Sequence, residues 1–63
     1  MRDINRIDKT CEALAEQWKR VPDWRLGQVM MNFLSAYGDP FYWEEDKFIK
    51  RLTEYMDMVA PKE

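Results

Sequence analysis

Four carboxylates in the middle of the sequence are the first residues that could hold a ligand. Asp39, Glu44, Glu45 and Asp46 offer the oxygen atoms that Mg²⁺ and Ca²⁺ prefer. On a helix, however, the three consecutive acids point in different directions, and the spaced D-x-D-x-D-G pattern of a calcium loop is absent. We therefore interpret the acids as a charged helix start that complements the helix dipole, and predict no metal site.

Cys11 is the one residue that could act as a strong nucleophile. It is the only cysteine and the chain has no histidine, so no disulfide within the chain, no Cys/His zinc site and no Cys–His pair can form. Cys11 also belongs to an apolar helical stripe, and we predict a buried thiol without cysteine chemistry. A chain of 63 residues has little room for a catalytic pocket. We predict no catalytic residues, no cofactor and no enzymatic activity.

Two basic pairs, Lys19–Arg20 and Lys50–Arg51, could contact phosphate groups of a nucleic acid. Acidic residues accompany both pairs, and the net charge of the chain is −2. Because a nucleic-acid interface needs a clustered basic face, we interpret these pairs as solvated surface. A small dimeric nucleic-acid-associated regulator that uses the four basic residues remains the alternative function.

Three consecutive aromatic residues, Phe41, Tyr42 and Trp43, cannot all face inward from one helix or strand. One interpretation is that Trp24 and Phe41 close the ends of a small core. Tyr42 and Trp43, together with Trp24 and Met31, lie outside or at the edge of the predicted apolar stripes. Exposed aromatic and methionine side chains are typical of interfaces. We predict that Trp24, Met31, Tyr42 and Trp43 bind a partner, and the alternative is that the aromatic residues complete the core.

Apolar residues recur every three or four positions along three segments, which predicts amphipathic helices over about 4–20, 24–37 and 40–59. The stripe of the first segment consists of Ile4, Ile7, Cys11, Leu14 and Trp18. The second segment is apolar around most of its circumference, so we expect it to be the central helix.

Proline, glycine and aspartate mark the corners between these segments. Pro22 ends the first helix, and Asp23 is the expected N-cap of the second. Gly38 suits the left-handed residue that closes a helix. Asp39 is the expected N-cap of the third helix, with Pro40 at its first position. The alternative is an aromatic loop followed by a helix that begins near Glu44.

The composition favours a single globular domain, with 46% hydrophobic and 14% aromatic residues. A chain this short is marginally stable unless it packs efficiently or associates with another chain. Since no apolar run approaches membrane-spanning length and the first ten residues lack a signal-peptide core, we expect no membrane contact and a cytoplasmic location.

Two sequence segments resemble a group of small uncharacterised proteins of Gram-positive bacteria and their phages. The segments are W-K-R-V-P-D-W-R-L-G-Q at 18–28 and D-P-F-Y-W-E-E-D at 39–46. Trp43 stands where an aliphatic residue is expected in that group. The resemblance covers most of the chain and implies a short accessory protein, in the cytoplasm of a bacterium or a phage-infected cell, and it implies no activity.

Together these features predict an all-α domain of three helices. The function that they favour is a protein–protein interaction module that self-associates, with a homodimer as the simplest assembly.

Overall fold

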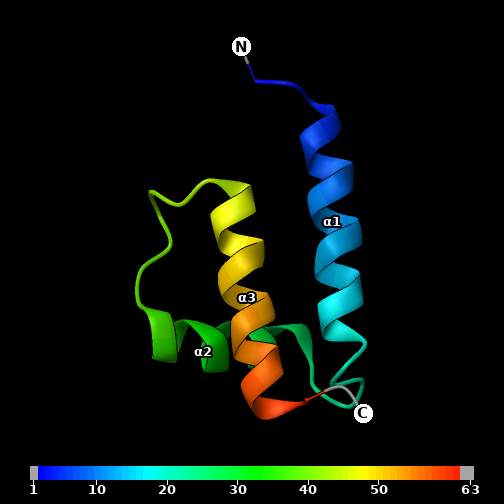
Figure 1. Ribbon diagram of the computed structural model, residues 1–63, viewed down its shortest axis with the longest axis vertical. Helices are drawn as coiled ribbons and strands as arrows, with labels where there is room; N and C mark the ends of the chain where they lie inside the picture. The colour runs from blue at the N-terminus through cyan, green and yellow to red at the C-terminus, as the bar shows by residue number, and fades with distance from the viewer. Residues whose placement is uncertain (1, 62–63) are drawn as a thin grey trace.

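Three helices make up the regular structure of the computed structural model, which describes residues 2–61 (Figure 1). Helix α1 spans Asn5–Trp18, α2 spans Leu26–Tyr37 and α3 spans Glu45–Val59. No strand occurs within the described residues. The predicted all-α, three-helix fold is confirmed.

Helices α1 and α3 lie side by side and run in the same direction, and α2 crosses the C-terminal half of α3 (Figure 1). Helix α3 packs against both other helices. The central helix is therefore α3, and the prediction that the second helix is central was wrong. The apolar arc of α2 is wide, but α3 and the aromatic residues that follow α2 cover only part of it, since Met31 remains 69% exposed.

The corner between α1 and α2 is longer than predicted. Helix α1 ends at Trp18 instead of Arg20, and the backbone then turns through a bond from the Val21 amide to the Trp18 carbonyl. The indole Nε1 of Trp18 donates to the carbonyl oxygen of Trp24 at 2.7 Å. This bond joins the two ends of the corner and satisfies the polar atom of a half-buried indole.

The N-cap of α2 is Arg25 and not Asp23, so the helix begins two residues later than predicted. The side chain of Gln28, in the first turn, accepts a hydrogen bond from the Arg25 amide at 2.7 Å. This amide lies at the start of the helix, where no carbonyl of a preceding turn is available, and the glutamine oxygen takes that place.

The segment 39–43, here called the aromatic turn, is not helical. The Asp39 carboxylate accepts the Phe41 amide at 2.9 Å, and the Trp43 amide donates to the Pro40 carbonyl at 2.9 Å. Asp39 therefore closes a local turn instead of capping α3, and α3 begins at Glu45 with Glu44 as its N-cap. The prediction of a helix from Pro40 was wrong, and the alternative of an aromatic loop is what the structure contains.

The core consists of five buried residues from α2 and α3: Val29, Phe33, Leu52, Tyr55 and Met56. Leu14 and Trp18 of α1 pack against it, as do Trp43 and Phe48. The three consecutive aromatic residues divide between core and solvent, since Trp43 is half-buried whereas Phe41 is 77% exposed and Tyr42 is 90% exposed. The interpretation of Phe41 as closing one end of the core was wrong.

The first prediction concerns the two glycines. Gly38 has φ 90° and ψ −158°, a conformation open essentially only to glycine, so Gly38→Ala should destabilise the fold by about 1–3 kcal/mol. Gly27 lies in the first turn of α2 with nothing within 4 Å of an added Cβ. Gly27→Ala should therefore stabilise the fold by about 0.5–1 kcal/mol. Thermal unfolding followed by circular dichroism measures both, and shifts of the same sign would contradict this assignment.

The second prediction separates Trp43 from Tyr42. Trp43→Ala removes a ring that packs on Phe33 and Phe48 and should destabilise the fold by about 2–3 kcal/mol. Tyr42→Ala, one residue away, should change the stability by less than about 0.5 kcal/mol because the side chain is almost fully exposed. Urea unfolding of the two variants is the measurement, and equal losses would show that the two rings do not divide in this way.

Candidate protein-interaction surface

Several large apolar side chains of the described residues lie at the surface instead of in the core. They occur at the N-terminal end of α1, on α2, in the aromatic turn and in the last turn of α3. The set is Ile4, Ile7, Leu26, Met31, Phe41, Tyr42, Met58 and Val59. Five apolar residues are buried, and nine more are half-buried against them, so these eight are the large apolar side chains that the core leaves uncovered.

The aromatic turn presents two of these side chains as a pair. The rings of Phe41 and Tyr42 lie 4.8 Å apart, centroid to centroid, at an interplanar angle of 80°. The next residue, Trp43, anchors the turn in the core, where its ring meets Phe33 edge-on at 6.1 Å. Lys47 places its Nζ 5.6 Å from the centroid of the Trp43 ring and covers part of it. The turn therefore holds an exposed aromatic pair on a well-packed base.

The four residues predicted to bind a partner fall into two classes. Tyr42 and Met31 are exposed and available for contact. Trp24 and Trp43 are half-buried and pack against the core. The sequence could not separate the two classes, because all four residues lie outside or at the edge of the helical stripes and their depth depends on the path of the corner and the turn.

Residues on α1 that sequence reasoning assigned to the core lie at the surface. Ile4 is 75% exposed, Ile7 is 48% exposed, and Cys11 is exposed. The predicted burial of Cys11 was wrong, because its helical stripe is covered only where Leu14 and Trp18 reach the core. We call Ile4, Ile7 and Cys11 the α1 stripe.

A different face of α1 lies against α3. It is formed by Arg6, Thr10, Ala13 and Gln17, which are spaced three and four residues apart and are buried or half-buried. Gln17 is 8% exposed, and its Oε1 accepts a hydrogen bond from Arg20 at 2.9 Å. A row of small and polar residues seldom indicates a packing face. The apolar stripe was therefore the more obvious candidate for the face of α1 that packs on the rest of the protein.

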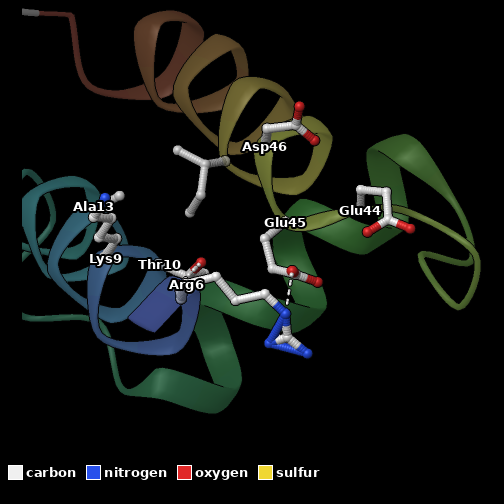
Figure 2. A pocket seen from close by; sticks show the side chains of 8 residues that line it. Arg6, Lys9, Thr10, Ala13, Glu44, Glu45 and Asp46 are labelled. Atoms are coloured by element: carbon white, nitrogen blue, oxygen red, sulfur yellow. Dashed lines mark hydrogen bonds and ion pairs between the residues drawn. The ribbon is translucent and has the colours of Figure 1, made fainter. Parts of the chain in front are cut away.

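The upper part of the α1–α3 contact is an open groove of about 460 Å³ between α1 and the start of α3 (Figure 2). Arg6 crosses it, with Nε 3.3 Å from Glu45 Oε1, although this pair lacks hydrogen-bond geometry. Glu45 and Asp46 lie in the first turn of α3 and Glu44 is its N-cap, as a charged helix start predicts, whereas Asp39 lies outside the helix. No group of three or more potential metal-binding side chains converges anywhere in 2–61.

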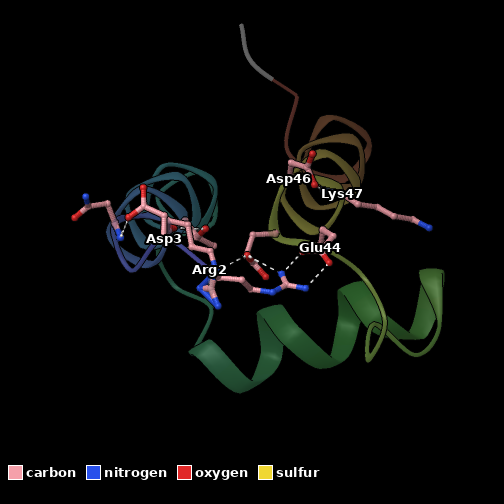
Figure 3. A network of polar contacts seen from close by, with 9 residues as sticks. Arg2, Asp3, Glu44, Asp46 and Lys47 are labelled. Carbon is pink, nitrogen blue, oxygen red and sulfur yellow. Dashed lines mark hydrogen bonds and ion pairs between the residues drawn. The ribbon is translucent and has the colours of Figure 1, made fainter.

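Arg2 adds a second ionic contact at the same place (Figure 3). Its guanidinium binds the Glu44 carboxylate through both terminal nitrogens, with Nη2 2.7 Å from Oε1. Hydrogen bonds from Arg2, together with its charge, hold the pKa of Glu44 below its ordinary value of 4.5. Both side chains are more than half exposed, so water and salt screen the pair and its contribution to stability is small. We call the contacts of Arg2 and Arg6 with Glu44 and Glu45 the ionic clasp.

Two of the four basic residues considered for nucleic-acid binding are engaged in contacts within the chain. The Arg20 side chain is 9% exposed and bonds to Asp57 and to the carbonyl of Ala60, both at 2.9 Å. Arg51 pairs with Glu54 at 3.1 Å. Lys19 and Lys50 are exposed. The basic pairs therefore do not present four free cations to a phosphate backbone.

Comparisons with protein-family models, curated proteins and solved structures give no match to this chain. The resemblance to small bacterial and phage proteins therefore stays a prediction. Among the described helices, none combines the length and the apolar character that crossing a bilayer requires.

The third prediction concerns the ionic clasp. Arg2→Gln removes the donor that lowers the pKa of Glu44, so this pKa should rise towards 4.5. Because folding lowers the pKa, the pair stabilises the fold above pH 4.5, and this contribution disappears as the pH falls through the folded-state value. The carboxyl carbon shift of Glu44, followed by NMR against pH, measures the effect. Arg51→Gln, which breaks a pair elsewhere on α3, is the control. An unchanged pKa in Arg2→Gln would contradict the contact.

Proposed function

We propose that this protein is a protein–protein interaction module that self-associates. The observation that carries the proposal is the set of eight exposed large apolar side chains among residues 2–61, which includes the aromatic pair of Phe41 and Tyr42. Burying apolar surface is the dominant favourable term in association. A second molecule that covers part of this set would remove that apolar surface from water.

The surface area of the chain supports the same proposal. A folded monomer of 7.7 kDa is expected to expose roughly 4,300 Å². This chain exposes 5,074 Å². The difference of about 770 Å² means that the chain covers less of its own surface than an average monomer of this mass.

The kinds of exposed residue favour a protein partner over a nucleic acid. Phe41, Tyr42 and Met31 belong to the residue types that are enriched in protein interfaces. A phosphate-binding surface instead depends on clustered Lys and Arg. Here the net charge is −2 and Arg20 is held within the fold.

The fourth prediction is that the molar mass depends on concentration. Light scattering over about a hundredfold dilution should give a mass near twice 7.7 kDa at the top of the series and should fall towards 7.7 kDa on dilution. Because the contact is mainly apolar, raising the NaCl concentration from about 0.1 M to 0.5 M should leave the mass unchanged.

A mass of 7.7 kDa at every concentration would contradict self-association. A larger mass that collapses in high salt would indicate an assembly held by ion pairs and would overturn the apolar surface as its cause.

A further inference from the structure

Helix α2 has one face in the core and an opposite face that is bare. Val29 and Phe33 are fully buried on the core side. The opposite face, here called the outer face of α2, consists of five exposed residues: Gly27, Gln28, Met31, Asn32 and Ser35. In Figure 3, α2 lies on one side of α1 and α3, and its far side meets no other element of residues 2–61. The outer face of α2 is therefore open to a partner.

The outer face of α2 carries no charge. No Asp, Glu, Lys or Arg occurs at 26–38, although 35% of the residues of the chain are charged. The exposed face of a helix in a globular protein usually carries charged and polar residues. Charged side chains are instead depleted at the centre of protein interfaces. An exposed helix face without a charge is therefore typical of a surface that another protein covers.

The two ends of this face carry opposite charges. Arg25 immediately precedes α2, and Asp39 lies two residues after its end. Both residues are exposed, and neither takes part in an ion pair within residues 2–61. The exposed charges of the corner before α2 are Lys19, Asp23 and Arg25, two positive and one negative, whereas the aromatic turn after α2 contains Asp39 alone. A surface with one net positive and one net negative end is complementary to an antiparallel copy of itself.

We propose that a second copy of this chain binds the outer face of α2, so that the two α2 helices pack antiparallel about a two-fold axis next to Met31. The proposal rests on the proposed function of self-association and adds the surface and the orientation. Arg25 lies six residues before Met31 and Asp39 eight residues after it, so the axis brings Arg25 of each copy opposite Asp39 of the other. A parallel arrangement would instead place Arg25 against Arg25, and these like charges repel.

Met31 suits the centre of such a contact. Its side chain is 69% exposed, and methionine adapts its shape to the surface that it meets. Gly27 and Ser35 lie one turn before and one turn after it, and their small side chains allow the two backbones to approach. A Cβ added at Gly27 would meet no atom within 4 Å, so the space beside Met31 is open. In the antiparallel pair, Gly27 of one copy lies opposite Ser35 of the other, and the two Met31 side chains fill the space between them.

The same arrangement covers exposed apolar side chains at both ends of α2. Leu26, the first helical residue, is 45% exposed, and the exposed pair of Phe41 and Tyr42 follows the other end. Antiparallel packing brings Leu26 of one copy towards the aromatic pair of the other. Arg25 arrives at the same place, where its guanidinium can lie on an aromatic ring. The apolar contacts supply the affinity, and the ion pairs at the rim fix the orientation.

The fifth prediction tests the centre of the contact. Met31→Glu places a carboxylate beside the two-fold axis on both copies and should raise the dimer dissociation constant by about a hundredfold. Glutamate is a strong helix former and the position is exposed, so the dilute monomer should keep its circular dichroism spectrum and thermal midpoint. Light scattering over a dilution series measures the dissociation constant.

Ile4→Glu is the matched control for Met31→Glu. Ile4 is 75% exposed and immediately precedes α1, whose first turn lies at the other end of the molecule from α2 (Figure 1). The change is the same in kind, from an exposed apolar residue to glutamate. The dimer of this variant should dissociate as that of the unchanged protein does.

Arg25→Glu tests the charges at the rim. A carboxylate then faces Asp39 of the other copy at both ends of the contact, and the dissociation constant should rise by about tenfold. Glutamate at the N-cap of α2 complements the helix dipole, so the thermal midpoint of the dilute monomer should stay the same or rise. A folded Arg25→Glu variant that dimerises as tightly as the unchanged protein would overturn the antiparallel arrangement.

Cysteine cross-linking measures the orientation directly, in a Cys11→Ser background that removes the only natural thiol. Met31→Cys places two thiols next to the axis, and a mild oxidant should convert the dimer into a disulfide-linked form. Ser35→Cys is the control, because its two thiols stand one helical turn from the axis on either side. They are then about 12 Å apart along the helices, beyond the reach of a disulfide. In a parallel pair both variants would cross-link equally, and that result would overturn the proposed orientation.

The outcomes separate this proposal from the proposed function. A protein that is monomeric at every concentration contradicts self-association, and the surface assignment falls with it. A protein that dimerises while Met31→Glu dimerises equally well keeps the proposed function and overturns the outer face of α2 as its site.

Discussion

The fold depends on the burial of one aromatic ring, Phe33 of α2. Its centroid lies 5.3 Å from the rings of Tyr37 and Phe48, 5.9 Å from Tyr55 and 6.1 Å from Trp43. A chain of 63 residues without a disulfide has few ways to remove enough apolar surface from water. Aromatic side chains bury more apolar area per residue than smaller side chains do, so a cluster of rings around a buried centre suits a short chain. This cluster holds α2, α3 and the aromatic turn together.

The position of this cluster decides which parts of the molecule are weakly held. It lies where α2 crosses α3, and Leu14 and Trp18 bring only the C-terminal half of α1 into contact with it. The N-terminal half of α1 contacts α3 through the half-buried Arg6, Thr10 and Ala13 and through the ionic clasp, whose side chains are between 37% and 59% exposed. Elements with few buried apolar contacts open locally at low cost in free energy. The first turns of α1 are therefore the part of the helical frame that buried apolar contacts hold least.

Helical periodicity predicted the number of helices, and Val29, Phe33, Leu52 and Met56, which are fully buried, are spaced four residues apart on α2 and on α3. It could not predict where α3 begins, since Asp39 is equally suited to capping a helix and to closing a turn, and the choice depends on where Trp43 finds cover. Nor could it predict the exposure of Cys11. Periodicity shows which residues share a face, but whether the face is covered depends on the length and crossing point of another helix. Trp43 is half-buried and Tyr42 is exposed, and one half of the apolar face of α1 is covered and the other is not. Both differences depend on how the helices pack against one another, which the sequence pattern does not specify.

The contacts that hold the two ends of α1 depend differently on salt concentration and pH. The face towards α3 is held by carboxylate–guanidinium contacts, which weaken as salt rises or as pH falls through the lowered pKa of Glu44. Apolar contacts depend little on salt concentration or on pH. Conditions that loosen the ionic clasp therefore weaken the N-terminal contact of α1 with α3 and leave the apolar contacts of Leu14 and Trp18 with the core in place. The two ends of α1 are thus held by different interactions, ionic at the N-terminal end and apolar at the C-terminal end, where Leu14 and Trp18 fix the helix to the core around Phe33.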